Sequence, residues 1–196
     1  MAARTTLDPL RRFRRWLRDA EKANEALPDA MALATTDPSG RPSLRYVLLK
    51  DVDDRGFVFY TNRLSRKGKE MASRPVASLA FYWHATGKQV RAEGSIETLS
   101  SSAADAYWAS RPRASQIASL ASNQSAPLPT RALLLKRVKF LEREYRGKDV
   151  PRPPHWIGYR LVPDRVEFWT RREPRLHQRE EFLKSGRGWT VRLLQP

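Results

Sequence analysis

The sequence contains no cysteine. This absence excludes disulfides, thiolate nucleophiles and cysteine-ligated zinc or iron–sulfur sites, and it fits a reducing compartment. Long apolar runs are also missing: no stretch approaches the ~18 residues of a membrane helix, and no hydrophobic signal segment stands at the N-terminus. There is no Gly-x-Gly-x-x-Gly motif either, so a Rossmann-type nucleotide site is not expected. We expect a cytoplasmic protein with no metal site and no membrane association.

The chain is long enough to bury a sizeable core, and we expect one domain over residues 1–196. Basic residues outnumber acidic ones by 37 to 21, which gives a formal charge of +16. Such a balance is typical of nucleic-acid binders. The basic residues are mostly arginine and are spread along the whole chain, which fits a basic surface around an anionic ligand equally well. Charge alone leaves both interpretations open.

An amphipathic helix is predicted over about residues 8–27. Asp8 is a suitable N-cap, and Pro9 suits the first turn. Leu10, Phe13 and Trp16 mark an apolar face, with arginines lying largely off it. We expect this helix to pack on the core. A helix that faces a membrane surface or RNA is the alternative.

Short β-forming stretches separated by turn residues dominate the rest of the chain. Strands are predicted at residues 31–36, 43–50, 57–61, 76–83, 89–99, 155–162, 166–169 and 189–194. Helices are predicted at about residues 66–73, 100–111 and 131–146. Short turns between successive strands imply antiparallel pairing. The fold class is therefore α+β, with an antiparallel barrel of six to eight strands and accessory helices.

The segment from Glu167 to Arg179 places three basic groups at alternate positions. We expect a turn around Pro174, followed by a strand on which Arg175, His177 and Arg179 point to the same face. Such a face is a good receptor for anions, because arginine offers a rigid fork of donors to phosphate or carboxylate. The alternative is a solvated edge strand protected by its charge.

A second cationic group lies where a helix is predicted to begin. Asn62 or Ser65 can cap this helix, so Arg66 and Lys67 stand in its first turn. Basic side chains there oppose the helix dipole, whereas a bound anion would bring them and the free backbone N–H groups together. The pattern indicates a phosphate site. A surface helix that tolerates the repulsion is the alternative.

Two further groups of side chains are candidate ligand contacts. Tyr107, Arg111 and Ser115 follow one another at a spacing of four residues, and together they can hold a phosphate monoester. Alternatively, Tyr107 is a core aromatic. Gln89 can hydrogen-bond the edge of a planar heterocycle, although one glutamine is a weak signal. The polar segment 122–125 is either a plain loop or a ligand loop.

These segments together resemble the pyridoxamine/pyridoxine 5′-phosphate oxidases, which are flavin mononucleotide (FMN) enzymes with a split-barrel fold. The resemblance runs from about Asp8 to Pro196, nearly the whole chain. The matching motifs are Arg45 to Lys50, Tyr60-Thr61-Asn62, Ser65-Arg66-Lys67, Gln89-Val90, Tyr107 with Ser110 to Arg113, Gln124-Ser125, Glu167-Phe168-Trp169, and Arg175-Leu176-His177 with Arg179.

The resemblance implies a role for each matched position. The FMN contacts would be Arg45, Tyr46, Val47, Leu48, Leu49, Lys50, Tyr60, Thr61, Arg66, Lys67, Gln89, Gln124, Ser125, Trp169 and Arg179. The substrate phosphate would contact Lys50, Tyr107, Arg111 and Ser115. Arg175 and His177 would face the pyridine ring of the substrate as the catalytic pair. The family is a homodimer with FMN at the subunit interface, which explains why cofactor residues are scattered through the sequence.

The implied reaction oxidises pyridoxamine or pyridoxine 5′-phosphate to pyridoxal 5′-phosphate, with O2 as acceptor and H2O2 as by-product. A sister group on the same fold makes phenazine pigments and tends to lose the basic residue at the end of the second strand, so Lys50 favours the vitamin B6 substrate. A phenazine-pathway oxidase and a basic nucleic-acid-binding barrel are the alternatives; we expect no nucleic-acid partner.

Overall fold

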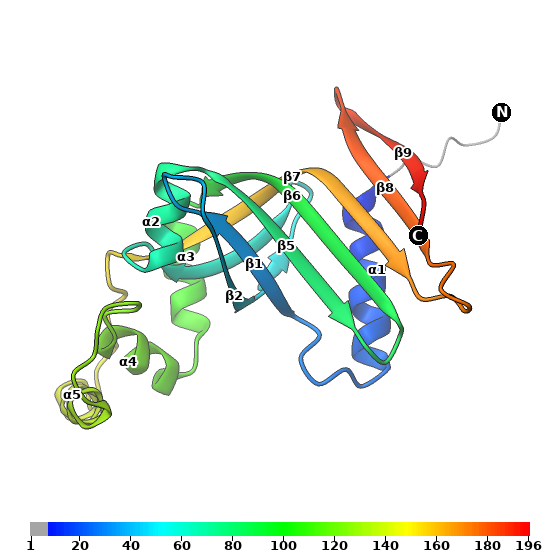
Figure 1. Ribbon diagram of the computed structural model, residues 1–196. Helices are drawn as coiled ribbons and strands as arrows, with labels where there is room; N and C mark the ends of the chain where they lie inside the picture. The colour runs from blue at the N-terminus through cyan, green and yellow to red at the C-terminus, as the bar shows by residue number, and fades with distance from the viewer. Residues whose placement is uncertain (1–7) are drawn as a thin grey trace.

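The computed structural model describes residues 8–196 (Figure 1). Helix α1 (Pro9–Lys22) begins where it was predicted, because the Asp8 carboxylate accepts hydrogen bonds from the backbone N–H groups of Leu10 and Arg11. The helix is shorter than the predicted 8–27. Its cap is Ala23, and the next residue, Asn24, has a φ of 55°, which lies in the left-handed region and ends the helix.

The described residues form one curled antiparallel sheet, which confirms the predicted split-barrel class. It has nine strands rather than six to eight: two of the eight predicted strands form one, and the strands Asp51–Val52 and Gln178–Ser185 are added. The strands are β1 (Ala30–Thr36), β2 (Pro42–Leu48), β3 (Asp51–Val52), β4 (Phe57–Asn62), β5 (Val76–Trp83), β6 (Lys88–Thr98), β7 (Trp156–Thr170), β8 (Gln178–Ser185) and β9 (Gly188–Leu194). Their order is β2-β1-β5-β6-β7-β4-β3, and β8 joins β9 to the far end of β7.

Strand β7 is the longest element and replaces two predicted strands. The predicted strands 155–162 and 166–169 are joined, because the chain stays extended through Pro163 and Asp164. The pairing with β6 shifts register between Glu93 and Gly94, and Gly94 lies opposite Pro163. A Cβ on Gly94 would stand 2.0 Å from the Val162 carbonyl oxygen, so only glycine permits this close approach. This shift in register therefore accommodates Pro163 without ending the strand.

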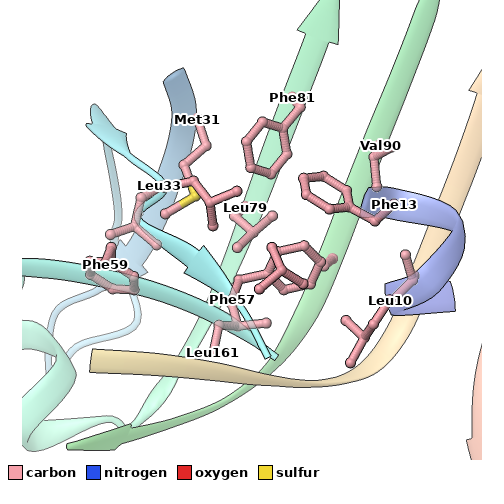
Figure 2. Packing of buried hydrophobic residues seen from close by; sticks show 14 of the residues in the cluster. Leu10, Phe13, Met31, Leu33, Phe57, Phe59, Leu79, Phe81, Val90 and Leu161 are labelled. Atoms are coloured by element: carbon pink, nitrogen blue, oxygen red, sulfur yellow. The ribbon is translucent and has the colours of Figure 1, made fainter. Parts of the chain in front are cut away.

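The main core lies between the curled sheet and α1, as predicted for the apolar face of this helix. Phe13 is fully buried, and its ring lies 4.9 Å from Phe57 and 4.8 Å from Phe81, measured between centroids. Met31 and Leu33 reach the same core from alternate positions of β1, as Figure 2 shows. Helix α1 thus covers one end of the half-barrel (Figure 1).

The remaining helices lie toward the other end of β7 (Figure 1). They are α2 (Arg66–Ser73), α3 (Ser101–Ser110), α4 (Arg113–Ala121) and α5 (Arg131–Glu144). Pro112 ends α3, as predicted, but it also stands at the N-cap of α4, a helix that we did not predict. A smaller core of Trp108, Ile117, Val150 and Trp156 holds α3, α4 and α5 against β7. No helix in the described part of the chain is long and apolar enough to cross a membrane.

Candidate anion-binding site

A cavity of about 670 Å³ lies between β2, β4, α2 and the end of α3. Most residues of the two predicted phosphate groups meet there, although they come from separate parts of the chain. The predicted residues that line it are Arg45, Tyr46, Val47, Leu48, Lys50, Tyr60, Thr61, Arg66, Lys67, Tyr107, Arg111, Gln124 and Ser125. Leu49 does not line it: its side chain is 5% exposed and packs in the main core.

A second cavity of about 380 Å³ shares Tyr60, Arg111 and Gln124 with the first. Ser115 lines this second cavity from the first turns of α4. The Arg111 guanidinium donates a hydrogen bond of 2.9 Å to Ser119 Oγ, one turn further along the same helix. Tyr107 thus lines the first cavity, Ser115 lines the second and Arg111 lines both, although a proline separates the two helices.

The first turn of α2 provides a buried cation. Ser65 caps the helix, as one of the two predicted caps, and Lys67 is only 6% exposed. The Lys67 ammonium donates to Thr61 Oγ1 at 3.1 Å and to Gln124 Oε1 at 3.2 Å, both neutral oxygens. Burial, and then repulsion by Arg45, lower the pKa of Lys67 to about 8. An anion in the cavity would favour the charged form of this lysine.

Arg45 is fixed in the wall of the cavity by a buried acid that sequence analysis did not single out. The Glu70 carboxylate accepts from the Arg66 Nε at 2.8 Å and from an Arg45 Nη at 3.2 Å. It also accepts from the hydroxyl groups of Thr35 and Ser43. Burial opposes ionisation of Glu70, but these hydrogen bonds prevail and lower its pKa to about 2. Glu70 is therefore a carboxylate at neutral pH.

Stacked aromatic rings form another part of the cavity wall. Tyr107 stacks on Tyr60 at 4.2 Å between centroids, and Tyr60 stacks on Trp156 at 5.3 Å. The Arg111 guanidinium carbon lies 4.8 Å from the Trp156 ring centroid and 5.1 Å from that of Trp108, so two indoles hold this cation. Burial lowers the pKa of Arg111. Trp156 was not predicted as a site residue, because a tryptophan at the start of a strand looks like a core residue.

Lys50 stands at the side of the cavity formed by the end of β2. Its ammonium forms an ion pair of 3.1 Å with the Asp29 carboxylate. The two groups are 26% and 36% exposed, so water screens this pair and the lysine can exchange it for another anion.

The other predicted FMN residues form a second group, outside both cavities. Gln89 of β6, Trp169 of β7 and Arg179 of β8 are direct neighbours across three paired strands. Arg179 binds Glu167 through two hydrogen bonds of 2.9 and 3.1 Å. The His177 ring lies 4.6 Å from the Trp169 ring, measured between centroids.

The predicted strand face of Arg175, His177 and Arg179 is wrong. Strand β8 begins only at Gln178, so Arg179 alone lies on it. The turn around Pro174 is longer than predicted, and Arg175 has a φ of 83° that no strand permits. The His177 Nδ1 instead accepts a hydrogen bond from the backbone N–H of Arg172, across the loop. Arg175 and His177 therefore project from a loop beside Trp169.

The two groups of residues lie at opposite ends of β7 (Figure 1). Tyr60 pairs with Gly158 near the start of this strand, whereas Gln89 and Arg179 flank Trp169 near its end. At about 3.3 Å per residue, the strand between Gly158 and Trp169 measures roughly 36 Å. One chain therefore does not bring both groups to one ligand of FMN size.

The fold and the cavity define a split-barrel protein with a cationic cavity. The chain belongs to the pyridoxamine 5′-phosphate oxidase family: the model with that description matches residues 17–142. A second model, described as the pyridoxine 5′-phosphate oxidase C-terminal dimerisation region, matches residues 156–196.

Individual relatives agree with this assignment. The chain is 51% identical to a pyridoxine/pyridoxamine 5′-phosphate oxidase of Myxococcus xanthus, over 96% of this chain and 92% of the relative. It is 47% identical to the enzyme of the same name from Gluconobacter oxydans, over 96% and 94%. Among solved structures, PhzG from Burkholderia lata 383, in complex with tetrahydrophenazine-1-carboxylic acid, has a TM-score of 0.94 and 37% identity, with coverage of 98% of this chain and 95% of that one.

Proposed function

We propose that this protein is an FMN-dependent oxidase that converts pyridoxamine or pyridoxine 5′-phosphate to pyridoxal 5′-phosphate. The observation that carries the proposal is the pair of cationic groups in one cavity. Arg66 and Lys67 stand at the helix α2 end, and Lys50 and Arg111 stand at the aromatic end. FMN and the substrate each bring one phosphate, so the reaction needs two such groups beside a planar wall.

The residues present fit FMN. Lys67 is a buried ammonium whose hydrogen-bond partners, among the described residues, are all neutral oxygens. A phosphate would supply the missing counter-charge, together with the free backbone N–H groups at the start of α2. Arg45 and Arg66 would complete the phosphate contacts. When bound, FMN would supply the redox chemistry of the reaction, namely hydride acceptance from the substrate and reoxidation by O2 with formation of H2O2.

We further propose that the working unit is a homodimer and that each FMN lies between two subunits. The 36 Å estimated along β7 supports this, because a two-fold partner can bring its Trp169 and Arg179 to the cavity that one chain leaves incomplete. The matched dimerisation region contains both residues. Beside the cavity, Tyr46 is 76% exposed and Leu44 is 67% exposed, so β2 offers an apolar surface for the partner.

In this arrangement each chain would contribute positioning and charge. Lys50, Tyr107, Arg111 and Ser115 would bind the substrate phosphate and hold the substrate against the flavin. Arg175 and His177 would approach the pyridine ring from the loop of the other subunit, orient it and stabilise the charge that develops on it. Each chain would function as a single domain over residues 1–196, in the cytoplasm.

A phenazine-pathway oxidase is the second candidate, because the similarity to PhzG from Burkholderia lata covers nearly the whole chain. Lys50 favours the vitamin B6 substrate, since it adds a cation where a substrate phosphate would lie. Peroxide and aldehyde formation from pyridoxamine or pyridoxine 5′-phosphate tests the choice. Turnover supports our proposal, and a yellow, flavin-loaded protein without turnover favours the second candidate. A colourless protein that carries nucleic acid would refute both.

A further inference from the structure

Glu70 is a buried acid in a site built to receive an anion. Its side chain is 5% exposed and joins three elements: Thr35 of β1, Ser43 and Arg45 of β2, and Arg66 of its own helix α2. A carboxylate beside a phosphate site weakens the attraction for phosphate by its own charge. Its presence there needs a compensating role.

The balance of charge around the cavity suggests that role. Arg45, Arg66 and Lys67 are three cations that line one end of it. Glu70 is the one acid of the described chain that forms an ion pair with any of them. Three cations and one carboxylate leave a net charge of +2. A phosphate monoester, which carries about −1.5 to −2 at neutral pH, nearly neutralises it. With Glu70 in place, the cations can stand close together before the ligand arrives.

We propose that Glu70 is a positioning residue for the cofactor phosphate: it holds Arg45 and Arg66 at the wall of the cavity and balances the charge of Lys67. The inference rests on the proposed function, because it assigns this end of the cavity to FMN. Glu70 acts through the two arginines and does not itself contact the ligand.

The two arginines depend on Glu70 to different degrees. Arg45 also donates to the Leu33 carbonyl oxygen at 3.1 Å and to Thr35 Oγ1, so it keeps partners without Glu70. The Arg66 side chain is 62% exposed, and Glu70 is its one ion-pair partner in the described chain. Loss of the carboxylate therefore frees Arg66, which then has to be ordered when FMN binds.

Glu70 also acts on Lys67, which lies one turn earlier on the same side of α2. The charged groups that face Lys67 are Arg45 of β2, which disfavours its protonated form, and Glu70, which favours it. The groups that contact it from β4 and the loop before α5, Thr61 and Gln124, are neutral. Removing the charge of Glu70 therefore lowers the pKa of Lys67 further below its ordinary value.

The test compares Glu70→Gln with wild type by titrating the flavin-free, full-length proteins with FMN between pH 6.5 and 9. FMN binding favours protonated Lys67, so affinity falls as pH rises through the pKa of that lysine in the free protein. We expect the E70Q protein to bind FMN about tenfold more weakly at pH 8. As pH rises, the decline in its affinity should begin at a lower pH than in wild type. Quenching of flavin fluorescence reports the dissociation constant.

Thr35→Val is the matched control. It removes a buried hydroxyl from the same network but keeps the Glu70 charge, so its affinity should fall at the same pH as in wild type. A role of Glu70 in folding alone would leave the pH dependence of E70Q and T35V alike. Equal FMN affinity and an unshifted pH profile in E70Q would overturn the inference.

The other outcomes separate this inference from the proposed function. If wild type itself does not bind FMN, the proposed function fails. If E70Q does not fold, Glu70→Asp replaces it: this variant keeps the charge but moves the carboxylate away from Arg66. We expect about threefold weaker FMN binding with the wild-type pH profile. Unchanged affinity in E70D would show that the position of the carboxylate does not matter and would refute the proposal.

Discussion

Replacing Lys67 with methionine should stabilise the flavin-free protein while it weakens FMN binding. The charged lysine is nearly fully buried without a carboxylate in hydrogen-bonding contact, and methionine fills similar space without a charge. The difference between 10.5, the ordinary pKa of lysine, and about 8 corresponds to roughly 3 kcal/mol of cost for the charged form. Lost hydrogen bonds to Thr61 and Gln124 offset about 1–2 kcal/mol of this. The net gain at pH 7 is then about 1–2 kcal/mol.

The stability that K67M gains over wild type should decrease as pH rises. Between about pH 8 and 10.5 the unfolded chain holds the Lys67 proton and the folded chain does not, so wild-type stability rises with pH in this range. The K67M protein lacks this rise. At pH 9.5 only about 1 kcal/mol of the cost remains, and the two proteins should be about equally stable.

Urea unfolding of the flavin-free proteins, at one fixed protein concentration and at pH 7 and 9.5, measures both effects. Lys69→Met is the matched control, because Lys69 is an exposed lysine on the same helix, and it should change stability by less than about 0.5 kcal/mol. A K67M protein that is less stable than wild type at pH 7, by an amount that does not vary with pH, would refute the reasoning.

Three further substitutions test separate parts of the site. Arg66→Ala should weaken FMN binding by about 1.5–3 kcal/mol, the value of one charged hydrogen bond. Unchanged affinity in a flavin titration would show that Arg66 does not bind the phosphate. Arg175→Ala should reduce turnover far more than flavin retention; a colourless protein would show instead that Arg175 holds the cofactor. Trp156→Leu removes one of the rings that hold Arg111. The KM for the phosphorylated substrate should therefore rise while the absorption spectrum of bound flavin stays the same. An unchanged KM would contradict this role.

The phosphate-binding end of the cavity was predictable because its signals are local. A cap at Ser65, followed at once by Arg66 and Lys67, needs only the geometry of one helix turn. Glu70 stands in the same helix, but its role depends on Thr35, Ser43 and Arg45 of other strands. No spacing rule within the helix reveals such contacts.

The loop that carries Arg175 was predicted wrongly because alternation was counted from a turn of assumed length. The alternation rule holds only after a strand has begun, and β8 begins three residues later than Arg175. Helix α4 was missed for a related reason: Pro112 was taken as the end of a helix, whereas proline also suits the start of one. The antiparallel barrel itself was predictable, because short turns between strands leave few other arrangements.

Complementation between two variants tests the central claim, that each site is built from both ends of β7 in two subunits. Arg111→Ala impairs the cavity and Arg175→Ala the loop at the other end, and each homodimer should be nearly inactive. A heterodimer of the two, isolated by two different affinity tags, contains one site with both changes and one site with neither. We predict about half of the wild-type oxidase activity for this heterodimer. Activity no higher than that of the two parent homodimers would contradict the shared site.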